Sequence, residues 1–291
     1  MALSIWIVPA LLTALFAASQ DAWVKRYFSS MSAYEMAAYP LTYSLPLFAA
    51  ALPFVAVPPL DRIFAVYFLL SLPVNGFGFL LHMRAIQTSP LSLTLPYLAF
   101  TPVFIFFTGF FILGEIPNGW GVVGVCIIVV GSYVLHINPA EFSPLAPLRA
   151  FGRERGAAYM LLAALIYGLG AVTGKKAILH SSVMFFSIFF FLCFNGGFLT
   201  GALLLKKTNI ERMRRMPLRG MVSGGLLFVH IVSHGFAISM TKAVYMIAVK
   251  RLSILFGILY GGWFFREKHM AYRILGAGLM VGGAMLITLK G

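Results

Sequence analysis

The chain has 291 residues, of which 60% are hydrophobic and only 10% are charged, whereas soluble domains average about 25% charged residues. This composition excludes an ordinary soluble protein and indicates an integral membrane protein. A formal net charge of +14 would suggest nucleic acid as the partner of a soluble chain. Here most basic residues lie in loops between apolar stretches, where they orient helices and contact anionic lipid, so we expect no nucleic-acid partner.

Ten apolar stretches are long enough to cross a bilayer, which takes about 20 residues. They cover residues 4–24, 34–56, 63–83, 89–111, 119–137, 156–174, 183–205, 219–240, 243–264 and 271–289. Short connections predict that consecutive helices are neighbours, and no sizeable soluble domain fits between them. The first stretch has no basic segment before it and has a counterpart later in the chain, so we expect a retained helix and not a cleaved signal.

The second half of the chain repeats the first. Residues 11–15, followed by Lys25, recur as residues 161–165, followed by Lys175, at an offset of 150 residues. At an offset of 152 residues, His82, Glu115, Gly124 and Gly131 recur as His234, Glu267, Gly276 and Gly283. The pattern predicts a first five-helix unit at residues 1–137, a linker at 138–155 and a second unit at 156–291.

An odd number of helices in each unit gives the two units opposite orientations in the membrane. The predicted fold class is therefore all-α integral membrane protein, with ten transmembrane helices as two inverted five-helix repeats. Inverted repeats are typical of secondary transporters, in which the substrate site lies between the repeats. One packing of such halves opens to either side when the halves exchange roles, which suits alternating access.

Basic residues are distributed unevenly between the two sides of the predicted membrane. The connections on the side of the first interhelical loop hold fifteen Lys and Arg residues, and the opposite side holds five. The positive-inside rule then places both termini outside the cytoplasm. We expect a multi-pass protein of the cell inner membrane in contact with its lipids.

The paired motifs resemble the drug/metabolite transporter superfamily, EamA type. The resemblance rests on the segment Pro102–Glu115 with Gly124 and Gly131, on its echo Gly261–Glu267 with Gly276 and Gly283, and on Lys25 and Lys175. It implies a ten-helix, inverted-repeat transporter of small metabolites with both termini in the cytoplasm, opposite to the charge count. Small multidrug members carry a membrane-embedded glutamate on the first helix, but Ala17 and Tyr167 occupy the matching positions here.

Lys250 and Arg251 lie in the middle of the ninth apolar stretch. A charge at that depth costs about 2.5–3.5 kcal/mol and needs a cavity or a partner. Adjacent residues point about 100° apart on a helix, so one of the two can line a cavity while the other braces a neighbouring helix. The pair is also similar to the phosphate-binding pair of the plastid sugar-phosphate translocators. The alternative is that both residues snorkel or form structural pairs.

Further polar candidates lie on the third and eighth helices. Asn75 and His82 share a face of the third helix, and His230 and His234 share a face of the eighth. Histidine can bind substrate or carry protons near neutral pH, although hydrogen-bonded core histidines are the alternative. Arg84, in the repeated segment of His82, completes the predicted substrate-binding set.

Acidic residues support an anionic substrate by their absence from helix centres. We expect Asp21 to pair with Lys25 four residues later, and Glu115 to begin the turn into the fifth helix, where acid is favourable. A cavity with central cations and no central anions should take an anionic or carboxylate-bearing metabolite. The sequence thus predicts a secondary active transporter, an exporter or exchanger, that works by alternating access.

Several other functions stay open at this point. They are a transporter or flippase of a lipid with an acidic headgroup, an exporter of amino acids or drugs, and an enzyme or assembly factor of the membrane. No nucleophile–base pair can be assembled, so we predict no catalysis and no cofactor. Cys126 and Cys193 lie inside apolar segments without metal-ligand spacing, so we predict no metal site. The oligomeric state is not predicted, and a monomer is compatible with the sequence.

Overall fold

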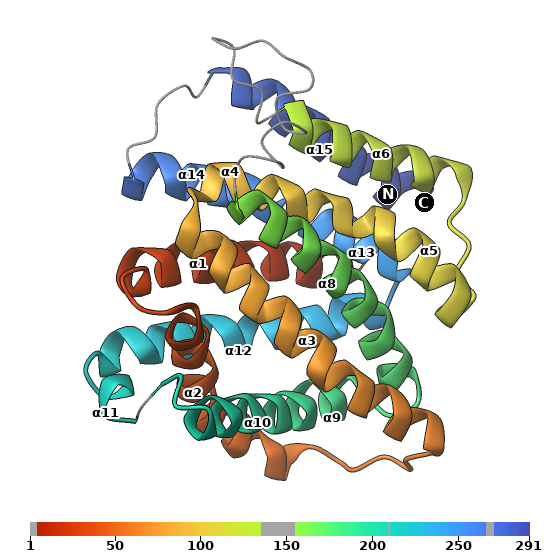
Figure 1. Cartoon of the computed structure of the whole chain (residues 1–291). Helices are drawn as coiled ribbons and strands as arrows, with labels where there is room; N and C mark the ends of the chain where they lie inside the picture. The colour runs from red at the N-terminus through yellow and green to blue at the C-terminus, as the bar shows by residue number, and fades with distance from the viewer. Residues whose placement is uncertain (1–4, 135–154, 209, 266–270) are drawn as a thin grey trace.

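The computed structural model describes residues 5–134, 155–208, 210–265 and 271–291, and within these ranges it is helical without β-strands. Figure 1 shows the helices packed in one bundle. The predicted linker 138–155 lies almost wholly outside the described residues. The first repeat contains α1 (Ile7–Phe28), α2 (Ala33–Ala51), η1 (Leu52–Phe54), α3 (Arg62–Thr88), α4 (Leu91–Thr94), η2 (Leu95–Phe100), α5 (Thr101–Leu113) and α6 (Gly119–Val134). The second contains α8 (Arg155–Leu179), α9 (Val183–Phe185), η4 (Phe186–Phe190), α10 (Phe191–Leu204), α11 (Ile210–Met213), α12 (Pro217–Ser239), α13 (Ala243–Lys250), α14 (Ser253–Phe265) and α15 (Ala271–Lys290).

These elements form ten passes, which confirms the predicted fold class. Five helices are long and apolar enough to cross a membrane: Ile7–Phe28, Arg62–Thr88, Arg155–Leu179, Val183–Leu204 and Pro217–Ser239. Large apolar side chains also cover the outside of the shorter helices; Phe111 on α5, for example, is 80% exposed. An apolar exterior of this extent is what contact with lipid requires.

Local signals in the sequence set several helix ends. Ser32 and Glu35 form a reciprocal capping box at the start of α2, and Asp61 caps α3 by accepting a hydrogen bond from the Phe64 N–H. The end of α5 falls at Gly114, whose φ of 69° lies in the left-handed region that glycine adopts without penalty. The predicted boundaries therefore differ from the observed ones by only a few residues.

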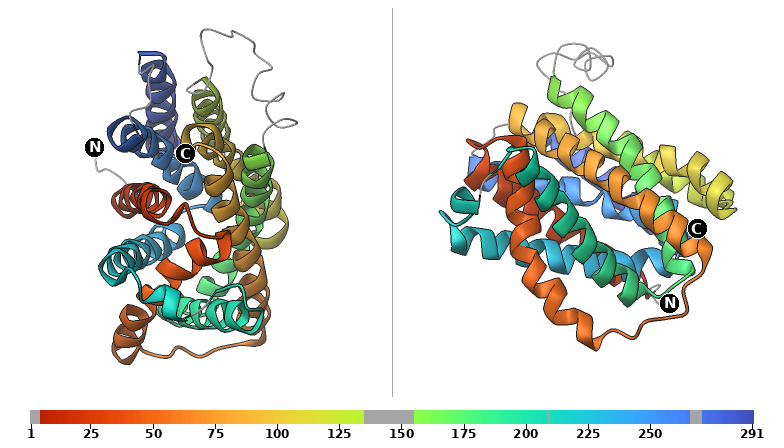
Figure 2. Two further views of the ribbon diagram at one scale, coloured as in Figure 1. Left: turned by 60° about the vertical axis from the view of Figure 1, so that its left-hand side comes forward. Right: turned by 60° about the horizontal axis from the view of Figure 1, so that its bottom comes forward.

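The two repeats pack against each other through corresponding helices. The first helix of each repeat, α1 or α8, lies along the third helix of the other, α12 or α3. The views in Figure 2 show α3 and α8 side by side over most of their length. The last helices of the repeats, α6 and α15, form their own pair at one edge of the bundle (Figure 1). This exchange of partners is the arrangement expected of two interlocked copies.

The fourth and ninth passes are interrupted at the same place in each repeat. In the fourth pass the six-residue η2 separates α4 from α5, and in the ninth the chain turns at Arg251 and Leu252 between α13 and α14. The 152-residue offset aligns Leu98 and Ala99 of η2 with Lys250 and Arg251. Broken helices of this kind free backbone groups near the membrane centre, where transporters bind their substrates.

Lys25 and Lys175, at corresponding positions near the ends of α1 and α8, make corresponding contacts. Lys25 Nζ donates to the carbonyl of Ser89, and Lys175 Nζ donates to the carbonyl of Thr241, the matching residue. Lys175 also forms a buried ion pair with Glu115, whose other oxygen accepts the Ala243 N–H at the start of α13 at 2.7 Å. Glu267, the counterpart of Glu115, lies outside the described residues.

The two repeats differ in how their second helices pack. Helix α2 lies tightly along α12, where a Cβ on Gly224 would stand 2.4 Å from the Tyr43 carbonyl carbon. The backbones of the corresponding pair, α10 and α3, approach less closely. Gly220 and Gly224 correspond to Phe68 and Leu72 on α3, whose bulk prevents the same approach. The backbones are therefore in close contact between α2 and α12, whereas packed aromatic rings such as those of Phe68 and Phe190 fill the space between α3 and the η4–α10 segment.

Candidate functional site

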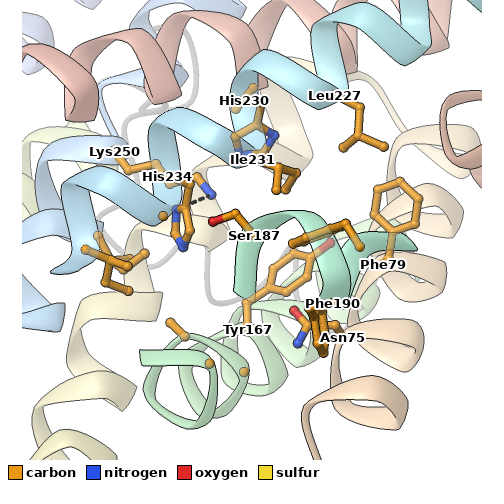
Figure 3. Close-up of a pocket in the computed structure, with 18 of the residues that line it drawn as sticks. Asn75, Phe79, Tyr167, Ser187, Phe190, Leu227, His230, Ile231, His234 and Lys250 are labelled. Atoms are coloured by element: carbon orange, nitrogen blue, oxygen red, sulfur yellow. Dashed lines mark hydrogen bonds between the residues drawn. The ribbon is translucent and has the colours of Figure 1, made fainter. Parts of the chain in front are cut away.

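A central cavity of about 170 Å³ lies between the repeats. It is lined from both halves, by α1, α2, η2 and α3 and by α8, η4, α10, α12 and the α13–α14 junction. Figure 3 draws 18 of the lining residues and labels ten of them. The polar side chains in the lining are those of Gln20, Asp21, Asn75, His82, Tyr167, Lys175, Ser187, His230, His234, Lys250, Arg251 and Ser253.

Lys250 and Arg251 reach the cavity from the break in the ninth pass. Lys250 is the last residue of α13, and its Nζ lies 3.4 Å from Nδ1 of His234 (Figure 3). Arg251 is only 4% exposed, and its Nε has no hydrogen-bond partner among the described residues. The negative end of a helix dipole favours a cation by about 0.3–1 kcal/mol. That gain is smaller than the roughly 2.5–3.5 kcal/mol cost of a charge at membrane depth.

The two histidines of α12 lie one turn apart on the cavity side, as Figure 3 shows. Their rings meet edge to face with centroids 6.3 Å apart. His234 faces Lys250, whereas neither ring nitrogen of His230 has a hydrogen-bond partner among the described residues. His230 is therefore not the satisfied core histidine that the sequence left as an alternative.

A carboxylate lies in the same cavity, contrary to the expectation that acidic residues stay at helix ends. Asp21 lies inside α1, and its Oδ1 stands 3.1 Å from Nε2 of His82 on α3. The sequence indicated Lys25 as the partner of Asp21 and did not indicate His82. The His82 ring also meets the Tyr167 ring edge to face, at 5.9 Å between centroids. The prediction of a cavity without central anions is therefore wrong.

The remaining predicted residues divide into one inside the cavity and one outside. Asn75 lines the cavity near Phe190 (Figure 3) and donates through Nδ2 to the Ser71 carbonyl at 2.8 Å. Arg84 is exposed and is absent from the cavity lining. It follows His82 by two residues, which is about 200° around a helix, so the two side chains point to opposite sides of α3.

The residues predicted from the sequence did not include an aromatic wall of the cavity, which is formed by Phe186, Phe190 and Phe194. The rings of Phe186 and Phe190 stack at 4.8 Å, and those of Phe190 and Phe194 at 5.9 Å. All three residues line the cavity. Their spacing of four residues was visible in the sequence and places them on one face of the seventh pass. The wall gives the cavity an apolar, stacked aromatic surface.

The arrangement suits reversible binding of a small polar molecule. Across the described residues, no three His, Cys, Asp or Glu side chains gather closely enough to hold a metal ion. The cavity offers cationic donors at Lys250 and Arg251, neutral donors and acceptors, and a stacked aromatic surface. These groups can hold an anion and its apolar part without changing either covalently.

Comparisons with known proteins agree with the two-repeat organisation. The sequence model of the EamA-like transporter family matches residues 4–137 and again residues 154–289. No curated protein matches the sequence. One solved crystal structure superposes with a TM-score of 0.69 at 14% identity and covers 99% of this chain and 98% of its own. At that identity the likeness shows the fold alone.

Proposed function

Since the chain belongs to the EamA-like transporter family, we propose that it is a secondary active transporter of a small anionic or carboxylate-bearing metabolite. Transport by alternating access agrees with the inverted repeats and with a central cavity lined from both of them. The observation that carries the proposal is the position of Lys250 and Arg251, two cations at the break of the ninth pass and inside this cavity.

The charge balance of the cavity favours an anion. Its lining contains Lys175, Lys250 and Arg251 against the single carboxylate of Asp21. Lys175 is neutralised by Glu115, and Asp21 stands against His82. With Glu115 counted against Lys175, and Asp21 counted against the pair Lys250 and Arg251, one net positive charge remains among these described residues when the histidines are neutral. An anionic substrate would supply a counter-ion and offset part of the cost of placing Lys250 and Arg251 at membrane depth.

The proposal is tested by thermal stabilisation of the purified protein with a panel of ligands. Carboxylates, phosphorylated compounds, cations and lipid headgroups are compared at matched ionic strength. A ligand that binds only the folded state stabilises it by about 2.7 kcal/mol at one hundred times its Kd. We expect stabilisation by carboxylated or phosphorylated compounds and its loss in Lys250→Ala and Arg251→Ala.

Lys242→Ala is the matched control, because Lys242 is a cation at the other end of α13 that does not line the cavity. It should keep the full response. Stabilisation by cations alone, or an anion response that persists in both cavity variants, would contradict the proposal. A response limited to acidic lipid headgroups would move the proposal to lipid transport.

We further propose that the protein lies in the inner membrane with both ends of the chain outside the cytoplasm. Ten passes put the start of α1 and the end of α15 on the same side of the bundle. Exposed basic side chains such as Arg26, Arg84 and Arg219 lie at the other side, and the positive-inside rule assigns that side to the cytoplasm. A reporter fused after Gly291 should give an extracytoplasmic signal, and one inserted after Lys206 a cytoplasmic signal; the reverse pattern would refute the orientation.

A further inference from the structure

We propose that Asp21 and His82 form a proton-binding site whose occupation strengthens anion binding at Lys250 and Arg251, so that the proton travels with the substrate. This inference rests on the proposed function and adds a coupling ion to it. Two helices of the first repeat, α1 and α3, supply the pair, whereas the cations come from the second repeat. The proton site and the anion site would thus lie on opposite halves of one cavity.

The geometry of the pair suits a shared proton. Asp21 Oδ1 and His82 Nε2 are 3.1 Å apart, and the two side chains are only 13% and 9% exposed. No described residue gives His82 Nε2 an aligned hydrogen bond. An added proton would turn the contact into a charge-assisted hydrogen bond, which is shorter and stronger than a neutral one. Because the two groups interact so closely, the proton belongs to the pair and not to either residue.

The surroundings of the pair link it to the anion site. Asp21 lines the same cavity as Lys250 and Arg251, and Tyr167 of α8 meets the His82 ring edge to face. The other titratable or charged side chains that share the cavity, among the described residues, are Lys175 of α8 and His230 and His234 of α12. Lys175 is already bound to Glu115. Asp21 is therefore the carboxylate of the lining that can compete with an anionic substrate for the two cations.

This competition fixes the sign of the coupling. When the pair is deprotonated, the Asp21 charge attracts Lys250 and Arg251 and repels an incoming anion. When the pair holds a proton, that negative charge is cancelled and both cations are free to bind the substrate. Linkage makes the effect reciprocal, so anion binding must also raise the affinity of the pair for a proton. Proton and anion therefore favour the same loaded state, as in a symporter.

Sulfate is a suitable probe, because it keeps its charge near neutral pH and contributes no proton of its own. Its affinity for the full chain in detergent is measured by calorimetry from pH 8 to pH 6. We expect binding to become at least about fivefold tighter over this range, the lower end of typical coupling between sites. In weakly buffered solution, an indicator dye should show proton uptake when sulfate is added to the unmodified protein.

Asp21→Asn mimics the protonated carboxyl group and should bind sulfate tightly at every pH in the range, without proton uptake. His82→Gln should also flatten the profile. The matched control is Asp61→Asn, which changes the other Asp–His contact of the chain, that of Asp61 with His180 at 2.7 Å. Asp61 is exposed and is not among the residues that line the cavity, so this variant should keep the unmodified pH dependence.

The outcomes separate the two proposals. Sulfate binding that requires Lys250 but is independent of pH and takes up no proton would overturn the coupling and leave the anion site standing. A pH dependence that survives in both Asp21→Asn and His82→Gln would assign the proton to another group and also overturn it. No sulfate binding at any pH would count against the anion site itself, and the coupling would fall with it. The measurement on the unmodified protein decides the question even if a variant does not fold.

Discussion

The two repeats share one framework and differ in the chemistry placed on it. Both have a broken helix at the same position, but Leu98 and Ala99 of the first repeat stand where the second has Lys250 and Arg251. In the first repeat the break lines the cavity with an apolar residue, and in the second it also brings two basic side chains into the cavity. Duplication can supply a pair of matching gaps in the membrane interior, and substitution in one copy can then turn one of the gaps into a binding site.

The second difference lies in the packing of the second helices. Gly220 and Gly224 admit α2 to close contact with α12, whereas Phe68, the counterpart of Gly220, packs its ring against Phe189 and Phe190 and keeps the backbones further apart. One structural consequence is that the backbones approach more closely between α2 and α12 than between α3 and α10. If the two repeats exchange conformations during transport, we expect the α2–α12 contact, which contains Gly220 and Gly224, to be more stable than the α3–α10 contact.

The largest effect is expected when a glycine of the second repeat is replaced by the residue at the corresponding position of the first repeat. Gly224→Leu, after Leu72, would drive a side chain into the Tyr43–Ser44 backbone, with Cβ only 2.4 Å from the Tyr43 carbonyl carbon. Extra methylenes in a packed site typically cost about 1–3 kcal/mol, but here a whole leucine side chain meets backbone atoms that cannot rotate away, so this variant should lose the most stability. Thermal unfolding in detergent should therefore show a clear loss of stability. Gly225→Leu, where nothing lies within 4 Å, is the control, and equal behaviour of the two variants would contradict the packing argument.

The next effect concerns the buried ion pair of Lys175 and Glu115, whose side chains are 6% and 16% exposed. Removing one partner of a buried ion pair typically lowers the free energy of unfolding by about 3–5 kcal/mol, because the other charge is left buried without a counter-ion. Glu115→Gln should therefore lower the thermal stability and release the start of α13. Lys176→Ala, at the half-buried neighbour, should change little.

A double variant sharpens this test of the ion pair. Glu115→Gln combined with Lys175→Met removes both charges, so it should recover part of the stability that Glu115→Gln loses. Double-mutant analysis of the melting temperatures measures this recovery. Purely additive losses would mean that the two side chains do not interact.

The smallest effect is expected at the helix caps, where the repeats also differ. Asp61 caps α3, whereas α12 begins at Pro217 without a side-chain cap. The Phe64 N–H, and then His180, lower the pKa of the exposed Asp61 below its usual value. The ionised cap therefore stabilises the fold above the unfolded-state pKa of about 4, and this contribution is lost as pH falls through the lowered folded-state pKa.

Asp61→Asn keeps a capping oxygen but removes the charge. It should melt slightly below the unmodified protein at neutral pH, and the difference should vanish as the medium becomes acidic. Melting curves between pH 7 and pH 3 measure this convergence. A difference that stays constant down to the acidic limit would show that the charge of Asp61 is not its cause.

The sequence predicted the ten passes well, because the length of an apolar stretch determines whether it can cross a membrane. It predicted the repeat well, because glycines recur at the same spacing in both halves. It also predicted that His82 and His234 correspond, and both line the cavity. It missed the contact of Asp21 with His82, because a lysine four residues away offers a local partner and only the packing of α1 against α3 brings the histidine close. The prediction of Arg84 as a substrate-binding residue was wrong for a different reason. Arg84 is close to His82 in sequence, but its side chain points to the other side of α3. The break beside Lys250 depends on tertiary packing and has no strong local signal.

The contact of α6 with α15 is built from glycines that correspond between the two repeats. Gly124 meets Gly283, where a Cβ on Gly283 would lie 2.7 Å from the Gly124 carbonyl oxygen, and Gly131 meets Gly276 in the same way at 2.9 Å. Gly124 corresponds to Gly276, and Gly131 to Gly283, so exchanging the repeats maps this contact onto itself. It has the self-complementary form of a two-fold symmetric dimer interface. A rearrangement that exchanges the conformations of the two repeats can therefore leave the α6–α15 contact unchanged. The repeats could rotate about this contact while the α2–α12 and α3–α10 contacts open and close.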